Sequence, residues 1–398
     1  MKIVIAPDSF KGSVSAVEAA AAIEKGIKNY APHAETVLVP VADGGEGTLD
    51  SLVAATGGAK VLVKVTGPLG IPVPAEYGLL GNGETCVIEM ASASGICLVS
   101  DDRKDPMVTT TYGTGELIRR ALDDGCRNFI LAIGGSATND GGIGMLQALG
   151  MRLLDFSGES VGFGGGELDR IAVIDDSEWD HRIAESTFLI ASDVKNPLVG
   201  PNGATFVFGP QKGATPEMVE ILDKNMHDWA NLVQSKTGIR MHDMPGAGAA
   251  GGLGGAFQAF FPAIMKRGID VVIEYTRLRD HLRGADLVFT GEGQIDFQTA
   301  SGKTPVGVAQ AAQKLGIPTF VLAGSIGRGI EELYEFGIHS IHSIVNAPMT
   351  LQAAIERAPE LLAQTAEQVI RAYMTNRPVN GTVGNEVHIQ RNFEKVVQ

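Results

Sequence analysis

Short apolar runs alternate with longer amphipathic segments at the start of the chain. Residues 2–6 form a compact apolar run that predicts a strand, and a capping box at residues 15–18 predicts the start of an alanine-rich helix over residues 16–30. A second apolar run at residues 36–41 and a second helical pattern at residues 48–55 follow. The pattern predicts a βαβα beginning.

The middle of the chain mixes two patterns. Three short alternating runs, separated by glycine and proline, predict antiparallel strands at residues 61–65, 74–79 and 85–90. Beyond them the sequence predicts helices at residues 115–124 and 144–149 and strands at residues 129–133, 188–191 and 205–208. The α/β rhythm of the N-terminus is therefore interrupted and then resumed.

After residue 283 the alternation of strand and helix patterns is regular. It predicts strands at residues 286–290, 319–323 and 338–345, with helices at residues 305–315, near 331 and at 351–373. These elements are suited to complete the sheet that begins at residue 2. The order of the strands stays open at this stage.

The fold class expected from these patterns is α/β with two domains. A doubly wound, Rossmann-like domain would comprise residues 1–62 and 283–374, interrupted by an inserted mixed α/β domain at residues 63–282. A polar C-terminal tail, residues 375–398, would be peripheral. A cleft between the two domains is the expected place for a ligand.

Composition narrows the class of protein. With 44% hydrophobic and 20% charged residues, the chain of 398 residues has an ordinary globular composition. A formal net charge of -14 without a local basic patch speaks against a nucleic-acid partner. The N-terminal apolar run is too short for a signal peptide.

Two further features bear on the cellular compartment. The three cysteines, Cys86, Cys97 and Cys126, show no C-x-x-C spacing, so neither a disulfide framework nor a zinc site is expected, and a reducing cytoplasm fits best. Residues 246–265 carry no charge, but six glycines and Pro262 make a membrane-spanning helix a poor interpretation. We expect a glycine-rich loop that leads into a buried helix, and no membrane partner.

Candidate chemistry begins at the ends of the first two strands. Asp8, Ser9 and Lys11 follow the first strand directly, and Asp43 and Glu46 follow the second among glycines. Open α/β sheets bind ligands at the carboxyl ends of their strands, so both groups are expected to face one cleft. For the first group alone, a capped turn with a solvated lysine explains the residues equally well.

A second set of candidates lies in the middle region. Residues 133–142 combine glycines with short polar side chains before a helix start, which suits a phosphate or carboxylate held by backbone N–H groups. The polar residues concerned are Ser136, Thr138, Asn139 and Asp140. Turns after the predicted strands 188–191 and 205–208 add Asp193, Lys195, Asn196 and Lys212, which surface loops could also carry.

A third set precedes the helix that starts at Pro305. Glu292, Asp296 and Lys303 lie between a predicted strand and this helix start, which favours an anion. The segment is not a Walker A loop, because Phe297 stands where the first glycine is required. The lysine can still meet a phosphate.

Other short motifs are weaker. Ser160 fits a hydrolase elbow pattern but has no following helix, so coincidence explains it better. Residues 246–251, with Asp270 further on, fit a dinucleotide fingerprint preceded by a poor strand, which keeps an NAD(P)-dependent reductase of hydroxy acids as an alternative. The eight scattered histidines suggest neither a zinc hydrolase nor a serine triad.

Once the weaker motifs are set aside, one pattern remains: carboxylates at strand ends, beside lysines and glycine-containing turns. They match the needs of magnesium-assisted phosphoryl transfer, which are charge neutralisation, positioning and a base for a hydroxyl. A non-catalytic protein that binds carboxylates is a second alternative. It is disfavoured because the same acidic residues would repel an anion without a metal ion.

Seven longer sequence motifs strengthen this interpretation. They are APDSFKGS at 6–13, PVADGGEGT at 40–48, GGSATNDGG at 134–142, NPLVGPNGA at 196–204, FGPQKGA at 208–214, TGEGQID at 290–296 and GKTPVGVA at 302–309. Together, and in this order, they closely resemble the bacterial glycerate kinase family. Ser192, Lys195, Gln294 and Phe297 depart from the family pattern, which bears on fine specificity rather than on the reaction.

The resemblance implies ATP-dependent phosphorylation of D-glycerate to 2-phosphoglycerate, with ATP and Mg²⁺ as cofactors, in a cleft between two α/β domains. Asp193 is then the expected carboxylate that orients or deprotonates the glycerate hydroxyl, with Asp43 as its rival and Lys11 beside them. Lys11, Lys212 and Lys303 would neutralise anions, and Glu292 and Asp296 would lie on the magnesium side. Substrate or phosphate contacts are expected from Asp8, Ser9, Glu46, Ser136, Thr138, Asn139, Asp140 and Asn196. The sequence leaves open the 2- or 3-phosphate product, tolerance for related hydroxy acids, and a monomer or homodimer.

Overall fold

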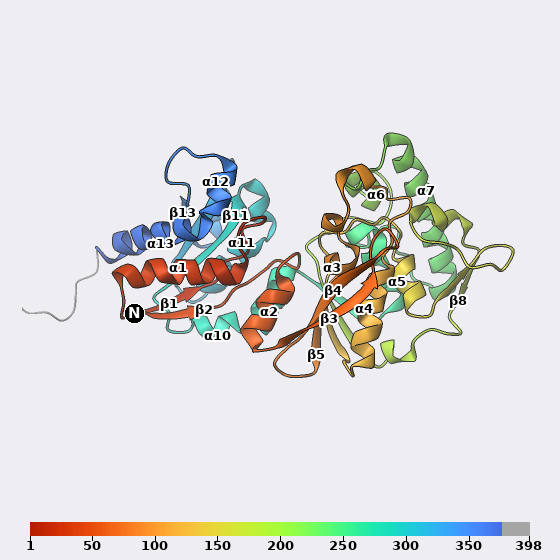
Figure 1. Ribbon diagram of the computed structural model, residues 1–398, viewed down its shortest axis with the longest axis horizontal. Coiled ribbons are helices and arrows are strands. Elements are labelled where there is room, and N and C mark those ends of the chain that lie inside the picture. Colours follow the sequence, from red (N-terminus) through yellow and green to blue (C-terminus); the bar gives the residue numbers. More distant parts are fainter. Residues whose placement is uncertain (376–398) are drawn as a thin grey trace, which may run out of the picture.

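Two sheets organise the computed structural model, which describes residues 1–375 (Figure 1). A five-stranded parallel sheet has the order β13 (Ile338–Ser343), β12 (Thr319–Ile326), β11 (Leu287–Ile295), β1 (Lys2–Ile5) and β2 (Glu35–Leu38). A six-stranded sheet has the order β10 (Ala263–Lys266), β9 (Thr187–Ala191), β6 (Asn128–Ala132), β5 (Thr85–Glu89), β4 (Pro72–Leu79) and β3 (Ala59–Thr66). The mixed α/β fold class is confirmed.

The five-stranded sheet joins the two ends of the described chain. β1 pairs with β2 on one side and with β11 on the other, where Ile3 lies opposite Leu287. Side chains alternate across a strand, so Ile3 and Ile5 face α1 (Ala16–Tyr30) and α13 (Ala358–Met374), whereas Val4 faces α9 (Gly268–Tyr275), α10 (Leu278–Leu282) and α11 (Thr304–Gln313). Helices therefore cover both faces of this sheet.

The predicted capping box fixes the start of α1. The side chain of Ser15 accepts a hydrogen bond from the backbone N–H of Glu18 at 3.2 Å, and the Glu18 carboxylate accepts one from the Ser15 N–H at 2.9 Å. Two of the N–H groups at the start of the helix thus have partners. The predicted helix at residues 16–30 is confirmed at both ends.

The six-stranded sheet is parallel in part. β5, β6, β9 and β10 run parallel, while β3, β4 and β5 pair antiparallel, as the alternating pattern predicted. One face packs against α4 (Tyr112–Asp123), α5 (Ile143–Ala148), α7 (Pro216–Thr237) and α8 (Leu253–Phe260). Short elements complete this half: α3 (Ala91–Ser94), α6 (Ala204–Phe208) and the hairpin of β7 (Arg152–Leu154) with β8 (Val173–Asp175).

One hydrophobic cluster spans both sheets. It contains Val4 of β1, Val87 of β5 and Ile130 of β6, together with residues of α2 (Thr48–Thr56) and α9. Figure 1 shows α2 between the two halves. The two sheets consequently share buried apolar contacts. The division into two domains stays a prediction, and its boundary at residue 62 falls inside β3.

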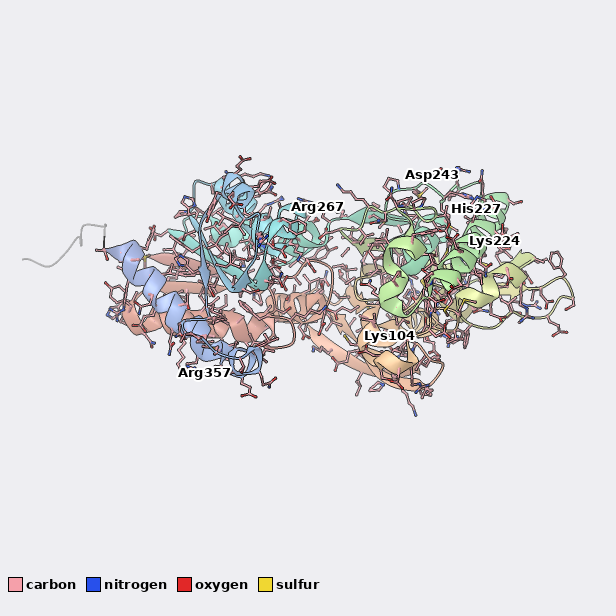
Figure 2. The ribbon with its side chains drawn as sticks, turned by 90° about the horizontal axis from the view of Figure 1, so that it is seen from above. Lys104, Lys224, His227, Asp243, Arg267 and Arg357 are labelled. Carbon is pink, nitrogen blue, oxygen red and sulfur yellow. The ribbon has the colours of Figure 1, made fainter. Side chains whose placement is uncertain are left out.

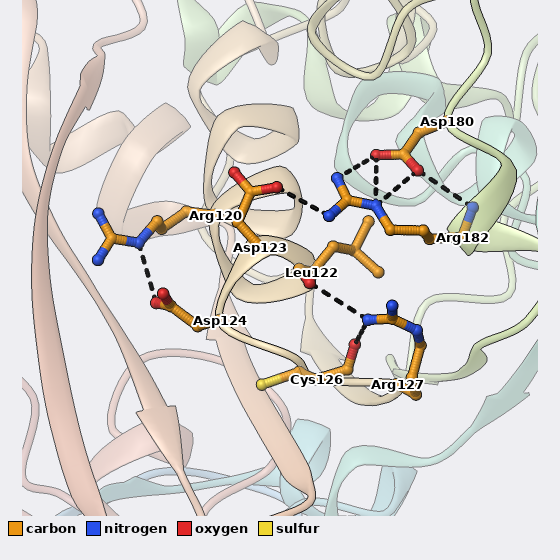
Figure 3. Close-up of polar contacts among 8 residues, drawn as sticks. All are labelled: Arg120, Leu122, Asp123, Asp124, Cys126, Arg127, Asp180 and Arg182. Atoms are coloured by element: carbon orange, nitrogen blue, oxygen red, sulfur yellow. Dashed lines mark hydrogen bonds and ion pairs between the residues drawn. The ribbon is translucent and has the colours of Figure 1, made fainter.

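Ion pairs connect α4 to residues 180–182, which precede β9, on the half with the six-stranded sheet (Figure 3). The Arg182 guanidinium contacts Asp123 at 2.8 Å and Asp180 at 2.6 Å. The Arg127 side chain donates to the carbonyl oxygens of Leu122 and Cys126, at 3.2 and 2.7 Å, so it satisfies acceptors at the end of α4. These contacts are structural, because none of these residues lines the cavity described below.

The structure corrects three predicted elements. Residues 205–208, expected as a strand, lie in α6, because a short apolar run does not distinguish a strand from a buried helical turn. β11 extends to Ile295, so Glu292 stands on the strand itself. The helix expected at 351–373 is divided into α12 (Leu351–Glu356) and α13, since Pro359 has no N–H to donate to the turn before it.

The glycine-rich segment has a packing explanation. Its expected form, a loop that leads into a helix, is confirmed by a 3-10 turn at Ala249–Gly252 followed by α8. An added Cβ would lie 2.2 Å from the Pro197 carbonyl oxygen at Gly248 and 2.0 Å from the Thr138 carbonyl oxygen at Gly251. The element directly before the segment is the helix α7 and not a strand, so the geometry of a dinucleotide-binding turn is missing there. Within residues 1–375 no helix is long and apolar enough to cross a lipid bilayer.

Candidate active site

A cavity of about 790 Å³ lies where elements of the two sheets meet. From the five-stranded sheet and its loops it is lined by Asp8, Ser9, Lys11, Asp43, Gly45, Glu46, Glu292, Gly293, Gln294, Lys303, Ser325 and Leu351. From the other half it is lined by Glu89, Ala91, Ser92, Gly95, Ile96, Cys97, Leu98 and Gly135. The volume is that of a site for a small molecule.

Seven of the predicted site residues line this cavity. They are Asp8, Ser9, Lys11, Asp43, Glu46, Glu292 and Lys303. The parallel sheet brings them together because β1 and β2 end at the same edge, and β11 lies beside β1. The remaining predicted residues, which do not line it, are Asp193, Ser136, Thr138, Asn139, Asp140, Asn196, Lys212 and Asp296.

Asp8 is a buried carboxyl in the wall of the cavity. Its Oδ2 accepts a hydrogen bond from the Thr304 hydroxyl at 2.5 Å, and its Oδ1 accepts one from the Ser9 N–H at 2.6 Å. Burial, and next the negative charge of Asp43, raise the pKa of Asp8 to about 8. At neutral pH Asp8 therefore holds a proton in the absence of a bound cation.

Glu292 is a second buried carboxyl of the same wall. Its Oε1 accepts a hydrogen bond from the Thr299 hydroxyl at 3.1 Å. Burial raises the pKa of Glu292 to about 7, with Lys303 opposing the rise and Asp43 contributing to it. Asp43 is thus a charge that both buried carboxyls experience. A cation bound among these groups would relieve their repulsion.

The donor set suits magnesium shared with a ligand. Among residues 1–375 no group of three or more His, Cys, Asp or Glu side chains is arranged to hold a metal ion by itself. Mg²⁺ in phosphoryl-transfer sites is usually bound by one or two carboxylates together with phosphate oxygens and water. Carboxylates such as Asp8 and Glu292, beside an open cavity, fit that mode of binding.

The protonated state of Asp8 predicts how stability changes with pH. The folded-state pKa of about 8 exceeds the usual value of 3.8, so the folded protein holds a proton that the unfolded chain releases. The free energy of unfolding should therefore fall as pH rises between these values, by up to about 1.4 kcal/mol per unit for this group. Asp8→Asn, which mimics the neutral acid, should not show this loss.

The measurement is denaturant unfolding of both proteins between pH 5 and pH 8 with a chelator present. The difference in unfolding free energy should move steadily in favour of Asp8→Asn as pH rises. A difference that is independent of pH would contradict a raised pKa at Asp8.

The predicted cradle at residues 136–140 is buried behind the cavity. Asp140 is fully buried, and its carboxylate accepts hydrogen bonds from the Thr111 N–H at 2.8 Å, the Thr111 hydroxyl at 2.8 Å and the Gly142 N–H at 3.1 Å. The Asn139 side chain donates to the Thr205 hydroxyl at 3.0 Å. These groups hold the loop from within, and Gly135 is the part of the loop that lines the cavity.

Lys212 belongs to the same buried network. Its side chain is only 2% exposed, and its Nζ donates to the Ser136 hydroxyl at 2.7 Å and to the Thr138 carbonyl oxygen at 2.6 Å. Burial lowers the pKa of Lys212 to about 7, against the opposing effect of Asp140. These contacts position the loop. Direct contact of Lys212 with a substrate anion stays a prediction.

Asp193 lies beside the cavity, after β9. Its Oδ1 accepts a hydrogen bond from the Gly268 N–H at 3.1 Å. Burial raises the pKa of Asp193 to about 6, the negative charge of Asp43 contributes, and Arg267 opposes. Figure 2 shows Arg267 near the middle of the long axis, where the two halves meet. Asn196 is further along the same loop, and its side chain donates to the Asn202 carbonyl oxygen at 2.9 Å.

Two glycines bring the loops of the two halves into contact beside Asp43. A Cβ added to Gly268 would lie 1.7 Å from the Asp43 carbonyl oxygen. One added to Gly44 would lie 3.0 Å from the Ala191 carbonyl oxygen. Only the absence of side chains allows this approach, which brings Asp43 close to Asp193.

Sequence reasoning missed two parts of the lining. Glu89, at the end of β5, accepts a hydrogen bond from the Leu49 N–H at 2.8 Å at the start of α2, and burial raises its pKa to about 7. A carboxylate at a strand end was the available signal. The apolar residues Ile96, Leu98 and Leu351 had no comparable signal, because apolar residues are usually core residues.

Comparison with known proteins extends the picture beyond the cavity. Residues 3–374 match the sequence model of the Glycerate kinase family. A glycerate kinase of Bacillus subtilis (strain 168) is 53% identical over 369 residues, covering 93% of this chain and 97% of the relative. A glycerate 2-kinase of Escherichia coli (strain K12) is 48% identical over 369 residues, covering 93% and 97%.

A solved structure is also similar. It is a crystal structure of a candidate glycerate kinase 2 from Salmonella typhimurium LT2, with a TM-score of 0.85 and 47% sequence identity. The similarity covers 94% of this chain and 98% of that chain. The mixed α/β arrangement therefore recurs over nearly the whole length of a related protein.

Proposed function

The chain belongs to the glycerate kinase family, and from this premise we propose that it transfers the γ-phosphoryl group of ATP to D-glycerate, giving ADP and 2-phosphoglycerate, in the cavity between the two sheets. The observation that carries the proposal is the convergence of carboxylates and lysines in one cavity. Asp43, Lys11 and Lys303 come from three separate segments that meet there. Phosphoryl transfer needs a base, cations and precise positioning, and little else from the protein.

We assign the base to Asp43. It lines the cavity, and its negative charge contributes to the raised pKa values of Asp8, Glu292 and Asp193, so it lies at the centre of the acidic group. As the glycerate hydroxyl oxygen bonds to the γ-phosphorus, the bond from phosphorus to the bridging oxygen of ADP breaks and the hydroxyl proton passes to the carboxylate. Asp193 is the rival for this role.

Lys11 and Lys303 are suited to the anionic groups. Both line the cavity, Lys303 directly before α11, where the first N–H groups of a helix also favour an anion. Asp8 and Glu292 are the residues that would hold Mg²⁺, which supplies neutralisation of phosphate charge when bound. Ser9 and Glu46 also belong to the polar lining. Cys86, Cys97 and Cys126 are free thiols, which supports a cytoplasmic location.

The test is a coupled assay of ADP release with D-glycerate, ATP and Mg²⁺, with the product identified by phosphorus NMR. Turnover that depends on magnesium and yields the 2-phosphate is expected. A 3-phosphate product would overturn the regiochemistry alone. No ADP release by folded protein would overturn the proposed reaction, and NAD(P) binding would then be the next measurement.

A further inference from the structure

We propose that the apolar part of the cavity lining, Ile96, Leu98 and Leu351, binds the purine base of the nucleotide, with Cys97 between Ile96 and Leu98 in the chain. This inference rests on the proposed function, because it assigns one of the two substrates to a part of the same cavity. It names residues whose chemistry is different from that of the carboxylates and lysines.

The two substrates differ in what they need from the protein. D-Glycerate is a small anion with two hydroxyl groups and only one CH and one CH2 group as apolar surface, so aliphatic side chains contribute little to its recognition. A nucleotide has a flat base that gains from contact with apolar side chains and a triphosphate that gains from cations. A cavity that contains both kinds of wall therefore fits the nucleotide.

The apolar side chains are open to a ligand. Both Leu98 and Leu351 line the cavity, and the exposed fraction is 40% for Leu98 and 78% for Leu351. Leu98 belongs to a 3-10 turn, Ile96–Leu98, on the half with the six-stranded sheet, and Leu351 begins α12 on the other half. Residues from both halves thus contribute apolar surface to a single cavity.

The apolar turn is connected to the acidic group through two backbone contacts. The Ile96 N–H donates to the Gly135 carbonyl oxygen at 2.8 Å. At the neighbouring Gly134, an added Cβ would lie 3.0 Å from the Cα of Gly45 in the loop that carries Asp43. Contacting backbone segments lie roughly 5 Å apart, so the apolar turn and the Asp43 loop are on the order of 10 Å apart. A nucleotide can extend from one to the other.

Cys97 provides a native reporter of this part of the cavity. The chain has three cysteines, of which Cys86 and Cys126 are buried and Cys97 is exposed. Cys97 also lines the cavity. A thiol reagent applied to the folded protein should therefore modify Cys97 alone, and a base bound against it should slow the reaction.

The experiment measures the rate of Cys97 modification by a disulfide reagent, with ligands at concentrations that calorimetry shows to be saturating. Magnesium-ADP and adenosine should each slow modification at least tenfold, whereas tripolyphosphate and D-glycerate should change it less than twofold. Cys97→Ser should lose the signal, which verifies the site of modification.

Each other outcome has a definite meaning. Protection by tripolyphosphate without protection by adenosine would reverse the assignment, with phosphates at the apolar wall. Binding of ADP without protection would overturn the inference and leave the proposed function intact. Absence of nucleotide binding, in a protein that still binds D-glycerate, would overturn the proposed function.

Kinetics give a second readout. Leu351→Ala should raise KM for ATP about tenfold, with KM for D-glycerate changed less than twofold. Leu62→Ala is the matched control, because Leu62 is 68% exposed and does not line the cavity. An equal rise of both KM values in Leu351→Ala would contradict a contact specific to the nucleotide.

Discussion

Asp43→Asn should lower kcat by about 10²- to 10⁴-fold, the usual range for loss of a general base. The side chain keeps its size but no longer accepts the hydroxyl proton of D-glycerate. KM for ATP should change little, since the change is confined to the step in which the proton moves. Steady-state kinetics with each substrate varied in turn will measure both parameters.

Two controls make this prediction specific. Asp193→Asn should lose less than tenfold in kcat, because Asp193 accepts the Gly268 N–H and does not line the cavity. Asp243→Asn should be neutral, since Asp243 has a 75% exposed side chain on the far half of the molecule (Figure 2). A larger loss in Asp193→Asn than in Asp43→Asn would reverse the two roles.

Gly268→Ala should reduce both stability and turnover. The new Cβ would lie 1.7 Å from the Asp43 carbonyl oxygen, and a backbone atom cannot move aside as the end of a side chain can. Overpacking of this kind costs about 1–3 kcal/mol of unfolding free energy. A displacement of about 1 Å at a catalytic group can lower kcat about 10²-fold. Thermal unfolding and steady-state kinetics measure the two effects.

Gly162→Ala is the matched control for this substitution. Its Cβ would meet the Glu167 carboxylate oxygen at 3.2 Å, which is the flexible end of a side chain that can adjust. Stability should stay within about 0.5 kcal/mol of the parent protein. If Gly268→Ala were as stable and as active as Gly162→Ala, the contact between the loops would not matter for the position of Asp43.

Local sequence signals predicted some elements well. The capping box defined the start of α1 because it involves residues three positions apart and needs no tertiary partner. The run at 205–208 was misassigned, since a strand and a buried helical turn share the same short apolar pattern. The break before α13 could have been predicted from Pro359.

How well the site residues could be predicted from the sequence depended on which of them become buried in the fold. Residues at strand ends could be grouped from the sequence, because parallel strands end at one edge of the sheet. Asp140 and Lys212 were predicted to contact a ligand; both make buried hydrogen bonds within the protein, and their contact with a ligand stays a prediction. Composition cannot distinguish a polar group that meets a ligand from one that meets its own chain. The contact of Gly268 with Asp43 joins residues far apart in sequence and had no local signal.

The pairing of β1 with β11 has a consequence for synthesis of the protein. Ile3 lies opposite Leu287, and the contact between Lys2 and Asp286 spans 284 residues. At about 5–20 residues per second, a ribosome needs roughly 15–60 s to make that intervening stretch. A pair of strands is marginal alone, so β1 and β2 must wait for β11, whereas all strands of the six-stranded sheet have been made by residue 266. β1 is therefore translated long before the strand that secures it, and its apolar residues are exposed to chaperones and to aggregation during that interval.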